Sequence, residues 1–119
     1  MNKILIITNH LLGIYAFRRE LITELVSQNY EVLVLSPYHP ISEQVKNLGC
    51  EVKYVNFDRK GTNPLKDVSL LSHYIKEIRN FRPTVVLSFT IKPNIYGGMA
   101  ARITKTPYII NITGLGSAL

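Results

Sequence analysis

The sequence has one cysteine, Cys50, and three histidines, His10, His39 and His73. A single cysteine cannot form an internal disulfide, so we expect the protein to work in a reducing compartment. It also excludes a zinc site built from several cysteines, and the histidines lie too far apart in the sequence for a local metal cluster. We therefore expect no bound metal ion.

Long apolar runs are also missing. The runs at residues 4–7 and 85–87 are far shorter than the roughly 20 residues that a membrane-spanning helix needs. The first run leads directly into the polar residues Thr8, Asn9 and His10, without the small-residue cleavage site of a signal peptide. We therefore expect neither a membrane span nor a secretion signal.

The composition is that of one globular domain. Of the 119 residues, 46% are hydrophobic and 18% are charged, which excludes a disordered chain. The net charge of +6 is unevenly distributed, because residues 52–119 contain ten Lys and Arg against three Asp and Glu. This basic half indicates anionic partners such as phosphates, nucleic acid or a lipid surface, or it simply solvates helix faces.

Buried, strand-like runs alternate with amphipathic, helix-like segments along the whole chain. The strand-like runs cover residues 3–8, 31–36, 52–55, 84–89 and 107–112. Helices are predicted after Gly13, around residues 41–48, over residues 64–82 and from Pro93 onward. Since a helix joins each pair of strands, we predict an α/β fold: a doubly wound, Rossmann-like parallel sheet of five strands with helices on both faces.

The helical periodicity also predicts which side chains face inward. These are the bulky apolar residues at helical spacing: Ile14, Phe17, Leu21, Leu25 and Val26; Val68, Leu71, Tyr74 or Ile75, and Ile78; and Ile95, Met99 and Ile103. In the last helix, the Gly97-Gly98 and Ala100-Ala101 pairs keep one side slim, so that a backbone or a ligand can approach it.

Ligands of such sheets bind beyond the carboxyl ends of the strands, at the point where the strand order reverses. The polar and glycine residues at the predicted strand exits are therefore the candidate binding residues. They are Asn9, His10 and Gly13; Thr90, Lys92 and Asn94; and Thr113, Gly114 and Gly116, to which we add Arg18 on the first helix.

Three of these candidates have specific alternatives. His10 can hydrogen-bond or deprotonate a sugar hydroxyl, which makes it the one weak candidate for catalysis, or it is an ordinary loop histidine. Arg18 reaches an acid, a carbonyl or a ligand phosphate, or its stem covers apolar surface. Lys92 lies just before a predicted helix start, where the helix dipole disfavours a positive charge. A bound anion between the Lys92 ammonium and the free backbone amides would explain a lysine at this position. Otherwise Lys92 is simply a solvated surface lysine.

Several familiar motifs are absent. No Gly-x-Gly-x-x-Gly follows the first predicted strand, and no P-loop occurs, so a dinucleotide site and phosphoryl transfer of the P-loop type are not expected. No carboxylate pair stands at the strand ends, which disfavours a two-carboxylate glycosidase. The first strand also lacks a following acidic pair, which disfavours a phospho-receiver domain.

Several segments resemble the start of bacterial retaining glycosyltransferases of family 4 (group 1). The resemblance rests on residues 3–13, 17–21, 31–37, 63–65, 83–88, 91–98 and 111–116, and it is strongest to capsular and surface-polysaccharide members. It implies a GT-B fold, in which an amino-terminal Rossmann-like domain receives the acceptor and a second domain holds the nucleotide-sugar. Residues 1–119 would be the first domain, inactive without the second. Many relatives have a histidine in the loop after the fourth strand, where this chain has Thr90.

The resemblance also implies the partners. The nucleotide-sugar is a substrate, not a cofactor, and such enzymes usually need no bound metal. Acceptors in the family are commonly undecaprenyl-pyrophosphate saccharides at the inner leaflet. The chain would then be cytoplasmic, either free or peripheral on the inner face of the membrane, with Lys92 on the acceptor pyrophosphate and no nucleic-acid partner.

Two alternatives remain open. One is the first half of a GT-B nucleotide-sugar 2-epimerase, and the other is a non-catalytic α/β binding domain. The sequence stops directly after a Gly-x-Gly turn, where a sixth element is expected, so we expect residues 1–119 to be part of a larger protein.

Overall fold

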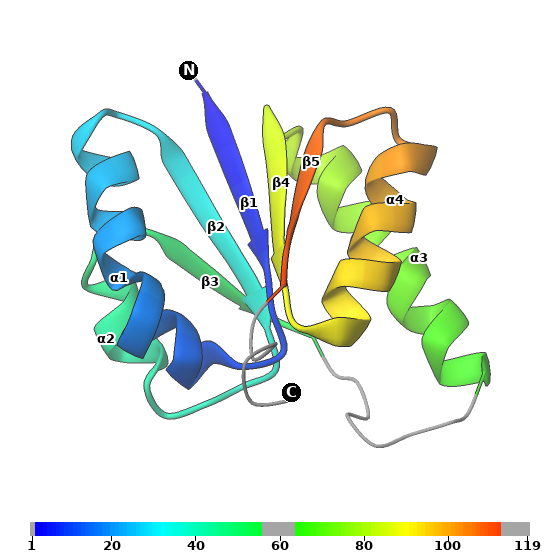
Figure 1. Cartoon of the computed structure of the whole chain (residues 1–119), viewed down its shortest axis with the longest axis horizontal. Coiled ribbons are helices and arrows are strands. Elements are labelled where there is room, and N and C mark those ends of the chain that lie inside the picture. Colours follow the sequence, from blue (N-terminus) through cyan, green and yellow to red (C-terminus); the bar gives the residue numbers. More distant parts are fainter. Residues whose placement is uncertain (1, 56–63, 113–119) are drawn as a thin grey trace.

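The computed structural model describes residues 2–55 and 64–112. Its centre is a five-stranded, fully parallel sheet with the strand order β3-β2-β1-β4-β5 (Figure 1). The strands are β1 (Lys3–Ile7), β2 (Glu31–Ser36), β3 (Glu51–Tyr54), β4 (Val85–Phe89) and β5 (Tyr108–Asn111). This confirms the predicted doubly wound α/β fold, with each strand within one or two residues of its predicted range.

Helices cover both faces of the sheet. Helices α1 (Leu11–Ser27) and α2 (Ser42–Lys46) lie on one face, whereas α3 (Pro64–Phe81) and α4 (Gly98–Ile103) lie side by side on the other (Figure 1). A π-helical turn, η1 (Pro93–Gly97), leads directly into α4. None of the helices in the described part of the chain has both the length and the apolar character that a membrane crossing requires.

Two hydrophobic cores sandwich the sheet, because successive side chains of a strand point to opposite faces. Ile4, Ile6 and Val34 pack against α1 and α2, and Leu5 and Leu33 pack against α3 and α4. Both sets are almost fully buried. The central strands β1 and β2 are therefore apolar at every position over residues 4–7 and 32–35, which is the pattern that the sequence shows.

Two helices are followed by residues with left-handed backbone. Asn29, just after α1, has a φ of 68°, and Gly49, after α2, has a φ of 106°. A Cβ on Gly49 would also lie 2.8 Å from Val26 Cγ1, so this turn needs glycine for its space as well as its conformation.

The predicted inward faces of α1 and α3 are partly wrong. In α1 the buried residues are Leu11, Ile14 and Ile22, and Phe17 is exposed. In α3 the buried centre is formed by Leu70, Tyr74 and Ile78, while Val68 is exposed. Both helices carry more apolar residues than one face accommodates, so periodicity alone selects the wrong edge of the stripe.

The inward face of the last helix is reversed from the prediction. Gly97, Gly98, Ala100 and Ala101 face the sheet, and the isoleucines and Met99 are exposed. The reason is distance: a Cβ on Gly97 would lie only 3.2 Å from Ile7 Cδ1. At this separation the small residues fit between helix and sheet, so the approach that they allow is to the sheet itself and not to a ligand.

Candidate functional site

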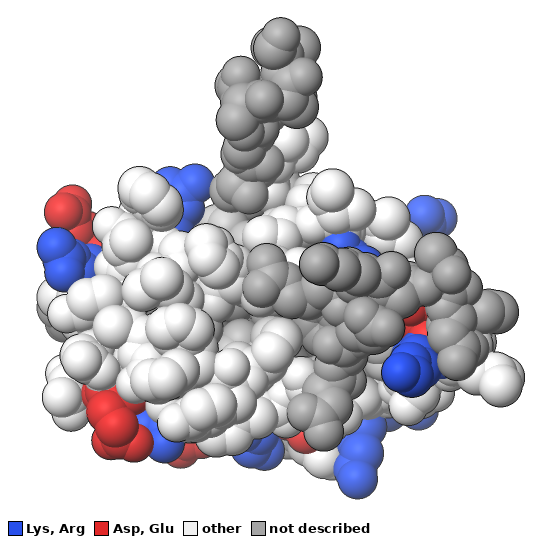
Figure 2. All heavy atoms as spheres, turned by 90° about the horizontal axis from the view of Figure 1, so that it is seen from below, with Lys and Arg blue, Asp and Glu red and all other residues white. Residues whose placement is uncertain are grey.

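The strand order reverses between β1 and β4, which are neighbours in the sheet but lead to strands on opposite sides. The first turns of α1 and η1 begin at the carboxyl ends of these two strands (Figure 1). Figure 2 shows this edge of the molecule end-on: much of the visible surface over α1 and α2 is uncharged, and charged side chains lie around the rim. This is the place where α/β sheets of this kind bind ligands.

The loops after β1 and β4 are joined by one hydrogen bond. The backbone N–H of Asn9 donates to Thr90 Oγ1 at 3.3 Å, and the Thr90 hydroxyl in turn donates to the carbonyl of Phe89. Thr90 has a φ of 74°, a left-handed conformation that is rare for a β-branched residue and costs about 1–3 kcal/mol. The structure thus brings the candidates Asn9 and Thr90 together at the point where the strand order reverses, and Thr90 is held there in a strained conformation.

His10 and Gly13 also lie together, at the start of α1. The helix begins at Leu11, two residues before Gly13, so the predicted start after Gly13 is wrong. His10 precedes it with an exposed side chain, and its backbone N–H donates to the buried Thr8 hydroxyl. A Cβ on Gly13 would lie 2.5 Å from His10 Nδ1. Gly13 therefore provides the space into which the imidazole folds.

Arg18 lies one turn further along α1 and is half-buried. Its guanidinium carbon is 5.5 Å from the ring centre of Phe89, the last residue of β4. This is a cation–π contact. The partners of Arg18 expected from the sequence were an acid, a carbonyl or a phosphate, and they did not include an aromatic ring. It places Arg18 beside the same strand end as Thr90.

Lys92 already has an anion in the structure, and it comes from the protein. Lys92 Nζ lies 3.1 Å from Asp67 Oδ1, and the Tyr96 hydroxyl donates to Asp67 Oδ2 at 2.9 Å. The Lys92 ammonium, followed by the Tyr96 hydroxyl, holds the pKa of the Asp67 carboxyl below its ordinary value. The same hydrogen bond raises the pKa of Tyr96. Asp67 and Tyr96 were missed from sequence.

Both the backbone and the side chain of Asn94 form hydrogen bonds within the protein. Its backbone N–H donates to Thr90 O at 2.9 Å, so the free amide expected at this position is not there. Ser88 Oγ donates to Asn94 Oδ1 at 2.8 Å, and Asn94 Nδ2 donates to the carbonyl of Asn111 at 3.0 Å. Asn111 Nδ2 donates back to Ser88 O at 3.3 Å. Asn94 thus fastens η1 to β4 and β5.

The helical turn at this point also starts earlier than predicted. Ile91 and Lys92 already have helical backbone, ahead of Pro93. Pro93–Gly97 is a π-helical turn, a feature that is frequent at functional sites in proteins. The widened turn places Asn94 over the two strand ends and Tyr96 toward Asp67 of α3, so one short segment contacts three elements.

Three candidates, Thr113, Gly114 and Gly116, lie outside the described residues, as does the connection after β3. Within residues 2–55 and 64–112, no three His, Cys, Asp or Glu side chains lie close enough together to hold a metal ion. The described site is a set of hydrogen-bonding groups around the β1 and β4 exits. It presents Asn9, His10 and Thr90, with Arg18 and Lys92 at either side.

The family described as glycosyl transferase 4-like matches residues 3–119. The chain therefore belongs to this family, and the resemblance seen in the sequence is confirmed. A curated relative from Campylobacter jejuni is 30% identical over 106 residues. It is named N,N'-diacetylbacillosaminyl-diphospho-undecaprenol alpha-1,3-N-acetylgalactosaminyltransferase, and the match covers 88% of this chain and 28% of the relative.

Solved structures of low sequence identity have the same fold. A glycosyltransferase from Rickettsia africae superimposes with a TM-score of 0.78 at 14% identity, over 92% of this chain and 29% of that one. MurG of Acinetobacter baumannii gives 0.73 at 18% identity, over 94% and 34%. UDP-GlcNAc 2-epimerase of Neisseria meningitidis gives 0.67 at 17% identity, over 92% and 32%. The fold is that of GT-B glycosyltransferases, and the chain spans about a third of the length of these proteins.

Proposed function

We propose that this chain is the acceptor-binding, amino-terminal domain of a glycosyltransferase. The full protein would move a sugar from a nucleotide-sugar donor to a lipid-linked saccharide, in the biosynthesis of a capsular or surface polysaccharide. The observation that carries the proposal is the match to a relative whose name specifies transfer to a diphospho-undecaprenol-linked sugar. The match covers 88% of this chain.

The chain supplies one wall of the proposed active site. Because it spans about a third of its relatives, the donor-binding domain would come from a further part of the polypeptide. Residues 1–119 alone are then expected to have no transferase activity. The reaction consumes a nucleotide-sugar and a lipid-linked acceptor at the inner face of the membrane, which places the protein in the cytoplasm beside that surface.

The described contacts support distinct roles for the candidate residues. His10 presents an exposed imidazole beyond the carboxyl end of β1, where we place the crevice of the proposed active site, and is the candidate for hydrogen bonding to an acceptor hydroxyl. Asn9 and Thr90 fix the relative position of the two loops, and Gly13 makes room for the imidazole. Thr113, Gly114 and Gly116 would add backbone and hydroxyl groups to the same crevice.

Lys92 is the candidate for holding the acceptor pyrophosphate. Its present partner, the Asp67 carboxylate, carries one charge, and a pyrophosphate carries more. The pyrophosphate of a bound acceptor would either share the Lys92 ammonium with the Asp67 carboxylate or replace that carboxylate as its partner. In the full-length enzyme, Lys92→Ala should raise the KM for the lipid-linked acceptor and leave the KM for the donor unchanged. An unchanged acceptor KM would remove Lys92 from this role.

The fold likeness to a UDP-GlcNAc 2-epimerase supports a second candidate. An epimerase would convert one nucleotide-sugar into its epimer and need no acceptor. The deciding experiment incubates the full-length protein with a panel of nucleotide-sugars, with and without an undecaprenyl-pyrophosphate saccharide. A glycosylated lipid supports the transferase, and a free epimer supports the epimerase. No turnover of any donor would favour a non-catalytic binding domain.

A further inference from the structure

The carboxyl ends of β2 and β3 carry two exposed tyrosines that the candidate site does not include. Tyr38 lies two residues after β2 and is 66% exposed, and Tyr54, the last residue of β3, is 40% exposed. Their ring centroids are 5.2 Å apart with an interplanar angle of 72°, which is an edge-to-face arrangement. Because β1, β2 and β3 end at the same edge of the sheet, this aromatic pair lies at the edge where ligands bind (Figure 1).

The loop that presents Tyr38 is short and restrained. It spans only residues 37–41 between β2 and α2, and prolines on either side of the Tyr38–His39 pair, Pro37 and Pro40, restrict its backbone. The hydroxyl of the buried Ser36 donates to the carbonyl of Pro37 at 2.9 Å. Tyr38 is therefore an exposed ring on a restrained backbone, which can bind a ligand at little cost in conformational entropy.

Polar side chains accompany the two tyrosines. His39 Nδ1 accepts a hydrogen bond from the backbone N–H of Ile41 at 3.0 Å, so the neutral imidazole carries its hydrogen on Nε2. On α2, Lys46 Nζ lies 5.8 Å from the ring centre of Tyr54 and 3.6 Å from Glu43 Oε1. The Glu43 side chain is 76% exposed. The same loop and the helix that follows it thus supply an imidazole donor, an ammonium donor and a carboxylate acceptor.

This combination of groups fits a sugar in its pyranose form. A pyranose has a face of C–H bonds and a rim of hydroxyl groups. The electron-rich face of an aromatic ring attracts polarised C–H groups, and imidazole, ammonium and carboxylate groups exchange hydrogen bonds with hydroxyls. The charges of Glu43 and Lys46 offset each other, so this place offers an anionic ligand no net attraction. A neutral saccharide is therefore the ligand class that the groups favour.

We propose that the exits of β2 and β3 form a saccharide subsite, in which the Tyr38 ring stacks against a pyranose of the acceptor. Tyr54 would support the Tyr38 ring, and His39 and Glu43 would exchange hydrogen bonds with hydroxyls at the rim of the sugar. The inference rests on the proposed function, in which the acceptor is a saccharide. Its additional content is a second contact for that saccharide, away from the sugar that reacts.

The position of the subsite relative to His10 determines which part of an acceptor it would hold. Strand β2 pairs with β1, and β3 pairs with β2, so the two exits lie one and two strand spacings from the β1 exit. Neighbouring strands are about 4.8 Å apart. A sugar on Tyr38 would therefore be a near neighbour, within one oligosaccharide, of a sugar at His10. The subsite thus favours acceptors of two or more sugars over acceptors of one.

Another exposed aromatic residue provides a matched control. Phe17 is 80% exposed, but it lies within α1 and not in a loop at the end of a strand. Phe17→Ala therefore removes an exposed ring of similar size from a different kind of place. A second control is Tyr38→Phe, which keeps the stacking ring and removes only its hydroxyl.

The binding test uses the purified chain, residues 1–119, and needs no transfer reaction. The probes are the methyl pyranosides of glucose, galactose, N-acetylglucosamine and N-acetylgalactosamine, each titrated against a chain with isotope-labelled tyrosine rings. We expect at least one pyranoside to shift the ring NMR signals of Tyr38 and Tyr54, and its C–H protons to receive saturation from these rings. No shift with any of the pyranosides, or shifts confined to other tyrosines, would overturn the proposal.

Single variants locate the contact. Tyr38→Ala should raise the dissociation constant of the bound pyranoside by about tenfold, because it removes the stacking ring. Tyr38→Phe and Phe17→Ala should bind as the unchanged chain does, and circular dichroism checks that every variant is folded. An equal loss in Phe17→Ala, or no loss in Tyr38→Ala, would contradict the assignment. So would a full-length Tyr38→Ala protein that is less stable but binds the pyranoside unchanged, since Tyr38 would then be a contact to another part of the protein.

The outcome is separable from that of the proposed function. In the full-length enzyme, Tyr38→Ala should raise the KM for a lipid-linked disaccharide by about tenfold and leave the KM for a lipid-linked monosaccharide and for the donor unchanged. Transfer to both acceptors without any dependence on Tyr38 would remove the subsite and leave the transferase standing. Pyranoside binding at Tyr38, with a free epimer as the product, would remove the transferase and leave the saccharide site.

Discussion

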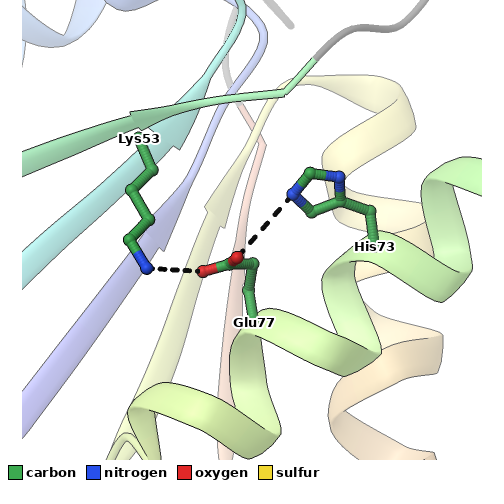
Figure 3. A network of polar contacts seen from close by, with 3 residues as sticks. All are labelled: Lys53, His73 and Glu77. Atoms are coloured by element: carbon green, nitrogen blue, oxygen red, sulfur yellow. Dashed lines mark hydrogen bonds and ion pairs between the residues drawn. The ribbon is translucent and has the colours of Figure 1, made fainter.

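Lys53 on the edge strand β3 forms an ion pair with Glu77 on α3, with Nζ 3.3 Å from Oε2 (Figure 3). The other carboxylate oxygen of Glu77 is 3.8 Å from His73 Nε2, one turn earlier on the same helix. Glu77 is only 8% exposed, whereas Lys53 extends to the surface. The ion pair joins the edge strand β3 to α3, the helix that leads to β4. Its acidic partner is buried, whereas its basic partner is exposed.

This asymmetry predicts unequal effects of the two partners on stability. Lys53→Met leaves a buried carboxylate with a weaker partner, which should cost about 1–3 kcal/mol in the free energy of unfolding. Glu77→Gln leaves an ammonium that water can reach, so it should cost less, about 1 kcal/mol or below. Urea unfolding measures both, with exposed Glu20→Gln on α1 as the control. A larger loss in Glu77→Gln would show that burial does not determine the cost.

The Asp67–Lys92 contact predicts a pH dependence of stability. A carboxyl whose pKa is lower in the folded than in the unfolded state stabilises the fold above its unfolded pKa, near 3.8 for Asp. This stabilisation is lost as the pH falls through the lower, folded pKa. We therefore expect the stability difference between the unchanged chain and Asp67→Asn to be constant near neutral pH and to shrink in strong acid.

Urea unfolding over a series of pH values measures this difference. Glu20→Gln serves as the control, because Glu20 is exposed and lies far along the chain from this contact. A difference that persists unchanged at the acid end would mean that Asp67 contributes through packing and not through its charge.

The sheet was predictable from the sequence because its physical cause is local. A strand that is covered on both faces must be apolar at every position, as Ile4 to Ile7 and Val32 to Leu35 are. Helical crossovers between successive strands then specify parallel pairing. The strand exits follow from this pattern, which is why Asn9 and Thr90 were identified as neighbours of the site.

The helix faces were less predictable because they depend on distances between elements. Nothing within the last helix shows that Gly97 lies against Ile7, and without that contact Ile95 and Met99 are the natural inward residues. The partners of Lys92 were missed for a similar reason, since Asp67 is 25 residues away in the sequence. One signal was available: α3 follows β3, so its first turn also lies near the carboxyl edge of the sheet.

The left-handed backbone of Thr90 predicts that a residue that adopts this conformation more readily can replace it, provided that a side-chain oxygen is retained as the hydrogen-bond acceptor. Asparagine adopts left-handed backbone readily and carries a side-chain acceptor, so Thr90→Asn should leave stability unchanged or raise it by up to about 1 kcal/mol. Thr90→Val keeps the strain and loses the acceptor for the Asn9 N–H, so it should cost about 1 kcal/mol. Thermal unfolding compares both variants with the unchanged chain, and a Thr90→Val variant as stable as the unchanged chain would show that the Asn9 bond contributes nothing.

The close contact between Gly13 and His10 predicts that substitutions at these two positions have coupled effects on stability. Alanine favours a helix over glycine by about 1 kcal/mol, so Gly13→Ala should stabilise a chain that lacks the imidazole, as in His10→Ala. With His10 present, the new Cβ would meet Nδ1 at 2.5 Å, so the gain should be cancelled and the ring displaced. A double-mutant cycle in urea measures this coupling, and the imidazole chemical shifts of His10 report the displacement.

The same pair tests the assignment of His10 to the crevice. If the imidazole contacts the acceptor, Gly13→Ala in the full-length enzyme should lower kcat/KM for the acceptor about as much as His10→Ala does, because the ring is present but misplaced. Ala16→Gly, further along the exposed side of α1, controls for a change of helix stability alone. Full activity in Gly13→Ala with a displaced ring would show that His10 has no part in acceptor binding.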